Sequence, residues 1–417
     1  MDDQTDNFRS VISLKVLGFR PRTIVAGVLI LLLVVSVISN PADLPTASDQ
    51  ALDYHNLSDL AWGVNKVLTL LLLAIFVIIG STTQISSKLL TYGKYVASIV
   101  FAVFIFTLSW LIQLPLERIR TTARNQLEDD PNLPLLQWIF SQFFASLPLI
   151  IFSIVAVLLV FWLINKSPRK WWLWTTAVFS FLFLAFLVVE PLTIDHQPLG
   201  QTPIEVKISQ LAAKIGVPKD SIVLENCEPF DKCDMAHVSG LGPTRLILLN
   251  KGLFENYPET WTIQTFAHES KHYLKDDNLT GWAVLTLIFL VLFWLLDRIC
   301  RVIIGRFSVQ LGFGSIAHAA ALPLVILVLN IMYLIALPPI NIFRQRVEFE
   351  ADRFGLELTH ENKGFTEMVS SWAAGSKLHT ANPSLFFMLF RSSHPSDADR
   401  ITFANEYRSR MQEGPGQ

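Results

Sequence analysis

The chain is organised around Phe266-Ala-His-Glu-Ser-Lys-His-Tyr273. Residues four apart on an α-helix lie one above the other on the same face, so His268 and His272 can offer imidazole nitrogens to one metal ion while Glu269 stands beside them. This is the H-E-x-x-H pattern, which is typical of zinc sites on helices. The preceding Asn256-Tyr-Pro-Glu259 indicates a helix start, because proline and an acidic residue are both favoured in a first turn.

The spacing of this motif also predicts a chemistry. Two imidazoles fill two corners of a zinc tetrahedron and leave the others for a third ligand and a water. Zinc lowers the pKa of a bound water to about 7, and a neighbouring carboxylate can take the proton and later pass it to a leaving amine. We therefore expect metal-assisted amide hydrolysis, with His268 and His272 as ligands and Glu269 as general base.

The composition predicts a membrane protein. Of the 417 residues, 52% are hydrophobic and 16% are charged, and the mean hydropathy is +0.44, whereas soluble proteins carry about 25% charged residues. A net charge of −2 without a Lys/Arg-rich run gives no basic surface, so no nucleic-acid partner is expected. Three cysteines without a C-x-x-C pair exclude a disulfide framework and a cysteine zinc ribbon.

Apolar runs long enough to cross a hydrocarbon core of about 30 Å indicate seven membrane helices, so the expected fold class is mainly α. A polar tail over residues 1–22 precedes five spans within residues 23–189, and two more lie within residues 280–340. The expected spans are Thr23–Ser39, Leu60–Gly80, Tyr95–Leu114, Phe140–Ile164, Trp171–Val189, Thr280–Leu296 and Ser315–Leu337.

Two polar regions complete the layout. Residues 190–279 form a soluble insert that contains the H-E-x-x-H helix, with strands expected at Ser221–Leu224 and Arg245–Leu249. Pro338-Pro339 are expected to interrupt the last helical run, because proline cannot donate a main-chain hydrogen bond. Residues 341–417 are then a C-terminal helical region.

The segment Arg346-Val-Glu-Phe-Glu-Ala-Asp-Arg353 offers the ligand that the first motif lacks. Glu348 and Asp352 are four apart on one helical face, so Glu348 can bind the metal while Asp352 orients a ligating histidine. The alternative is a charged helix with surface salt bridges, since three arginines are close by.

Taken with His268-Glu-Ser-Lys-His272, this E-F-x-A-D sequence closely resembles the M48 metalloproteases, in particular the Ste24 CAAX prenyl protease family and its bacterial relatives. The segment Ala236-His-Val-Ser-Gly-Leu-Gly-Pro-Thr-Arg245 is similar to the substrate-side strand of this family. Ser393-His394-Pro395 followed by Arg400-Ile401 resembles its S-H-P with a trailing E-R. Five spans before the zinc helix and two between the metal motifs also fit the Ste24 branch.

The resemblance implies one zinc ion per chain, held by His268, His272 and Glu348, with Glu269 as general base. It implies that His394 and Arg400 help to hold substrate or the developing oxyanion. It also implies seven helices around a water-filled chamber, with a small α+β zinc protease domain of the gluzincin type at one end. The residues that it places along the substrate are Ala236, His237, Val238, Ser239 and Gly240.

The chain departs from the family pattern at two places. Met235 and His237 stand where the family usually has Asn and Tyr, and Arg344-Gln345 replaces its Ser-Arg pair. Extended substrate is held on such a strand largely by main-chain hydrogen bonds. We therefore expect altered side-chain specificity and retained catalysis.

The sequence therefore predicts a multi-pass membrane zinc metalloendopeptidase that cuts membrane-associated, prenylated or lipid-linked peptides or misfolded membrane proteins. The expected partners are a peptide or protein substrate and membrane lipid. One alternative is a catalytically silent chamber protein that keeps zinc for binding or scaffolding, although three candidate ligands favour an open, catalytic position. The other is a transporter, whose paired half-helices the sequence lacks.

Two arguments about the side of the membrane disagree. The Lys and Arg residues of the tail and of the second, fourth and sixth loops share one side of the membrane, which is then the cytoplasmic side. This places the zinc domain on the non-cytoplasmic side of the membrane, which is expected to be a bacterial inner membrane or an ER-type membrane. The Ste24 resemblance implies the reverse. Cys227 and Cys233 can pair in an external domain and should stay thiols in a cytoplasmic one, and two unrelated surface cysteines are the alternative.

Overall fold

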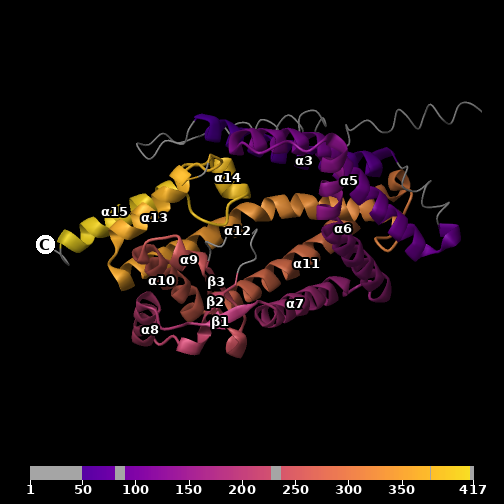
Figure 1. Cartoon of the computed structure of the whole chain (residues 1–417). Coiled ribbons are helices and arrows are strands. Elements are labelled where there is room, and N and C mark those ends of the chain that lie inside the picture. Colours follow the sequence, from indigo (N-terminus) through magenta and orange to yellow (C-terminus); the bar gives the residue numbers. More distant parts are fainter. Residues whose placement is uncertain (1–48, 80–89, 227–235, 376, 414–417) are drawn as a thin grey trace, which may run out of the picture.

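The computed structural model of the chain describes residues 49–79, 90–226, 236–375 and 377–413 (Figure 1). Within these ranges, 6 helices are long and apolar enough to cross a membrane. The first predicted span, Thr23–Ser39, lies outside the described residues, and the other predicted spans overlap these helices one for one. The helices are α3 (Asp49–Ile79), α5 (Lys94–Glu128), α6 (Leu135–Lys166), α7 (Trp171–Val189), α11 (Asp277–Leu311) and α12 (Leu322–Thr359).

Several of these helices run well beyond the apolar stretches that predicted them. α5 continues past Leu114 to Glu128, and α11 continues past Leu296 to Leu311. The added turns contain more charged and polar residues than the spans themselves, and pairs one turn apart stabilise them, such as Arg124 Nε with Glu128 Oε2 and Arg301 Nε with Asp297 Oδ1, each at 2.8 Å. Hydropathy therefore located the middle of these helices and missed the turns that extend them, whereas α7 has the predicted bounds.

α12 shows that the predicted interruption at Pro338-Pro339 is wrong. The helix is continuous from Leu322 to Thr359, and both prolines lie inside it. A proline removes one main-chain hydrogen bond, but packing can hold the helix together. Here Asn341 Nδ2 donates to Leu389 O at 2.9 Å and Gln345 Nε2 donates to Met388 O at 2.8 Å, so the short helix α14 (Leu385–Phe390) supports the turns after the prolines. The predicted boundary at residue 340 therefore falls inside one helix.

A four-stranded sheet lies at one end of the long helices (Figure 1). Its order is β1-β2-β4-β3, with β2 and β4 parallel and the two outer pairs antiparallel. The predicted strands are present as β2 and β4, each shifted by one residue, and β3 forms an edge. The strands are β1 (His196–Pro198), β2 (Ile222–Glu225), β3 (Ala236–Ser239) and β4 (Leu246–Asn250).

Three helices accompany the sheet: α8 (Pro203–Ile215), α9 (Gly252–Glu255) and α10 (Glu259–Lys275). α8 begins with a capping box between Thr202 and Glu205, and it ends at Gly216, whose φ of 78° favours glycine. Phe266 of α10 is fully buried in a core shared with β2, β4 and α8. This core fixes the H-E-x-x-H helix against the sheet.

The C-terminal part adds α13 (Asn362–Gly375) and α15 (Asp397–Glu413), which pack against each other (Figure 1). Phe365 and Val369 of α13 share a buried cluster with Ile401 of α15 and Leu356 of α12. α12 also packs closely on α10 near Gly355, where an added Cβ would lie 2.6 Å from Gln264 Nε2. The absence of a side chain there lets the two motif-bearing helices approach.

Candidate metal centre

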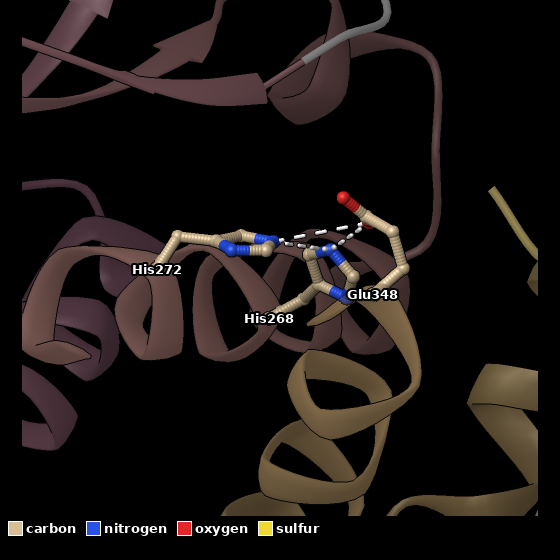
Figure 2. Close-up of side chains that lie close together, drawn as sticks. All are labelled: His268, His272 and Glu348. Carbon is tan, nitrogen blue, oxygen red and sulfur yellow. Dashed lines mark hydrogen bonds and ion pairs between the residues drawn. The ribbon is translucent and has the colours of Figure 1, made fainter. Parts of the chain in front are cut away.

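α10 and α12 bring three metal-ligating atoms to one point (Figure 2). His268 Nε2 lies 3.2 Å from His272 Nε2 and 3.3 Å from Glu348 Oε2, and His272 Nε2 lies 3.8 Å from that oxygen. In a zinc tetrahedron with ligand distances of about 2.0–2.2 Å, neighbouring ligand atoms lie about 3.3–3.6 Å apart. The spacing and the donor types of these three side chains therefore fit a zinc ion.

His268 is held in the orientation that a metal ligand needs. Its Nδ1 lies 2.9 Å from Asp352 Oδ1 and can donate its proton to that oxygen, which leaves Nε2 facing Glu348 and His272. Burial lowers the pKa of His268, but the hydrogen bonds to Asp352 and Glu348 outweigh it and raise the pKa to about 10. The surroundings of this imidazole thus favour a positive charge, whether a proton or a metal ion supplies it.

His272 has a matching support that the sequence analysis missed. Its Nδ1 lies 2.7 Å from Asp277 Oδ2, and Lys271 Nζ donates to the same oxygen at 2.8 Å. Asp276 makes this possible, because its left-handed φ of 55° ends α10 and starts α11 at Asp277. The only signal in the sequence was the Asp-Asp pair directly after the motif helix.

Glu269 follows His268 on α10 and is 9% exposed. It lines a cavity of ≈ 1110 Å³ that also reaches His268, His272 and Glu348. The predicted general base and the predicted ligands therefore share one cavity.

Arg400 lies behind the predicted metal ligands. Its Nε and Nη2 donate to Asp352 Oδ2 and Oδ1 at 2.7 Å and 2.6 Å, and its guanidinium lies 5.0 Å from the centre of the Trp372 ring. These contacts make Arg400 a positioning residue for Asp352, and through it for His268. The expectation that Arg400 holds substrate or the oxyanion stays a prediction.

His394 approaches the same point from the segment between α14 and α15. Its Nε2 lies 3.6 Å from Glu348 Oε2, and its Nδ1 lies 3.0 Å from Ser393 Oγ. The side chain is 60% exposed and lines the cavity. It therefore has room to contact a substrate bound beside Glu348.

The predicted substrate strand divides between the cavity and the interior. Ala236, His237 and Val238 line the cavity. Ser239 is buried and donates through Oγ to Glu190 Oε2. Gly240 turns the chain with a φ of 87°. The first three of the five predicted residues therefore line the same cavity as the predicted metal ligands.

Comparisons with known proteins agree with this geometry. Residues 198–408 match peptidase family M48. The chain is 25% identical over 383 residues to the uncharacterized metalloprotease YhfN of Bacillus subtilis (strain 168), a match that covers 88% of each protein. Its fold is similar to the crystal structure of S. mikatae Ste24p, with a TM-score of 0.66 at 17% identity, covering 90% of this chain and 94% of that one.

Proposed function

This chain belongs to peptidase family M48 and is a multi-pass membrane metalloprotease, and we propose that its metal is zinc and that it hydrolyses internal peptide bonds. The observation that carries the proposal is the convergence of two imidazole nitrogens and one carboxylate oxygen within 4.8 Å. Each imidazole has its other nitrogen beside a carboxylate, at 2.9 Å for His268 and 2.7 Å for His272. Such carboxylates are typical partners of metal-ligating histidines.

In this mechanism His268, His272 and Glu348 hold one zinc ion per chain. Zinc, when bound, supplies a water of lowered pKa and polarises the scissile carbonyl. Glu269 takes a proton from the attacking water and returns it to the leaving amine. His394, whose exposed imidazole lies next to Glu348, donates a hydrogen bond to substrate or to the developing oxyanion.

The cavity supports a substrate that is associated with the membrane. Its walls include apolar side chains of three of the long helices, such as Leu187 of α7, Leu285 of α11 and Ile340 of α12, together with the edge strand β3. An extended peptide on β3 would therefore have apolar surface beside it. Lipid-linked or prenylated peptides and misfolded membrane proteins are the proposed substrates.

Glu269→Gln tests the proposed reaction, because it removes the base and keeps every ligand. We expect the purified variant to retain one zinc per chain and to lose about 10²- to 10⁴-fold in cleavage of a membrane-peptide mixture read by mass spectrometry. Glu357→Gln is the matched control, since Glu357 pairs with Arg353 on the exposed side of α12. Wild-type cleavage by Glu269→Gln would refute the assigned base. A wild-type protein that binds zinc and cleaves no peptide would support the alternative of a catalytically silent chamber protein that keeps zinc for binding or scaffolding.

We also propose that the site faces away from the cytoplasm. Lys166 at the end of α6 and Arg169 and Lys170 in the connection to α7 lie at the end of these helices away from the sheet (Figure 1). The connection between α5 and α6 begins instead with Asp129, which pairs with Lys377. Lys377 lies shortly after α13, and α13 packs on the motif helix α10. Cytoplasmic loops carry the excess of Lys and Arg. This distribution supports the placement that the charge bias predicted.

A further inference from the structure

A side chain occupies part of the free edge of β3. Asn278, in the first turn of α11, donates through Nδ2 to Val238 O at 3.2 Å and to Gly240 O at 3.1 Å. β3 pairs with β4 on one side and is the last strand of the sheet on the other. Val238 O accepts from Asn278, outside the sheet, so the main-chain groups of Val238 face away from β4, and so do those of Ala236 two residues earlier in the strand. Gly240 lies beyond the end of β3, and its carbonyl faces the same amide.

The contacts of Asn278 leave a short main-chain tract for a peptide. On the outward side of β3, the groups that remain are the N–H and carbonyl of Ala236 and the N–H of Val238. Beyond them the strand ends, because Gly240 turns the chain with a φ of 87°. This turn requires glycine, since an added Cβ would collide with the Thr244 carbonyl. A peptide that adds to this edge therefore has three hydrogen-bonding groups among the described residues.

We propose that Asn278 is a specificity-determining residue that ends the substrate-pairing tract of β3 at Val238. This inference rests on the proposed peptidase function. The amide of Asn278 occupies the position of the next substrate N–H, so an added peptide pairs with residues 236–238 and then turns away or ends. Gly240, predicted to contact substrate, is excluded from that role.

The position of Asn278 also fixes the end of this tract relative to the metal site. Asn278 directly follows Asp277, whose carboxylate holds His272. One junction between α10 and α11 therefore sets both the orientation of a predicted zinc ligand and the last paired position of β3. The number of substrate residues between the scissile bond and that position should be constant across substrates.

Backbone N-methylation of a cleaved peptide tests the proposal on the wild-type protein. An N-methyl group removes one substrate N–H, and one hydrogen bond contributes about two- to tenfold in binding. The methyl group is placed in turn on each residue of the substrate segment that lies on β3. At the residue facing the Ala236 carbonyl, it should lower kcat/KM by this factor. It should have no effect two residues further on, at the residue facing Val238 O. Sensitivity at both positions would overturn the inference while leaving the peptidase function intact.

Asn278→Ala provides the complementary test. Without the amide, Val238 O becomes available to substrate. The substrate residue facing Val238 O should then become sensitive to N-methylation. A peptide that extends to this residue should be cleaved about two- to tenfold better than a peptide that ends before it. Asn330→Ala is the matched control, because Asn330 Nδ2 donates within its own helix, to Ile326 O at 2.8 Å. An unchanged methylation pattern in a zinc-loaded Asn278→Ala protein would overturn the proposal. If that variant does not fold, the wild-type scan alone decides, and absence of cleavage of any peptide would refute the peptidase function itself.

Discussion

Asp352 should couple metal affinity to folding stability. Its fully buried carboxylate lies 2.9 Å from His268 Nδ1 and accepts two hydrogen bonds from Arg400 at 2.7 Å and 2.6 Å. Asp352→Ala removes the support of a predicted zinc ligand and leaves a buried guanidinium without its counter-ion. Loss of one partner of a buried ion pair costs about 3–5 kcal/mol, and loss of a carboxylate behind a ligating histidine weakens metal binding about 10- to 100-fold.

A double variant separates these two effects. Asp352→Ala with Arg400→Met removes the unpaired charge as well, so most of the stability of the metal-free protein should return while zinc affinity stays about 10- to 100-fold low. Denaturant unfolding of the metal-free protein in detergent measures the first quantity, and competition with a chelating dye measures the second. Asp129→Ala is the control, because its pair with Lys377 is mostly exposed and should contribute less than about 1 kcal/mol.

Two results would contradict this reasoning. If Asp352→Ala unfolds at the wild-type denaturant concentration, Arg400 does not depend on Asp352 for its charge balance. If the double variant regains wild-type zinc affinity, the carboxylate does not support His268, and the loss in the single variant came from the unpaired guanidinium.

Three further outcomes are expected. Asp277→Ala should weaken zinc affinity about 10- to 100-fold by removing the support of His272, and an unchanged affinity in a chelator competition would show that the 2.7 Å contact has no role. Val238→Pro should impair peptide cleavage with zinc content unchanged, since proline is tolerated on an edge strand and removes only the outward N–H; loss of zinc or of folding, with Val238→Ala intact, would make the segment structural. With the site facing outward, a membrane-impermeant thiol reagent should label Cys227 or Cys233 on intact cells after mild reduction, and labelling only after permeabilisation would place the site in the cytoplasm.

Local patterns were enough to predict the elements that carry the ligands. The two histidines and the Glu348-Asp352 pair each lie within one turn of one helix, so helical periodicity alone places them on a common face. The strands β2 and β4 were predictable because both are short, apolar and buried. The match to peptidase family M48 confirms the family that these motifs indicated.

The contacts that complete the site were not predictable, because they join residues without a shared local pattern. Arg400 reaches Asp352 from 48 positions along the chain, and Asn278 reaches Val238 from 40. Asp277 is close to His272 in sequence, but it meets the imidazole only because Asp276 adopts a left-handed conformation. The continuity of α12 through two prolines likewise depends on contacts with α14. The six residues of α14 carry no sequence signal for those contacts.

The carboxylates that orient the two histidines come from different long helices. Asp352 on α12 orients His268, whereas Asp277 at the start of α11 orients His272. The short helix α10 is therefore fixed from both sides, and the 3.2 Å between the two Nε2 atoms depends on how α11 and α12 are placed relative to each other. Both are candidate membrane helices, so a change in their packing would change the spacing of the predicted metal ligands. Two candidate membrane helices therefore contribute to the geometry of the predicted metal site.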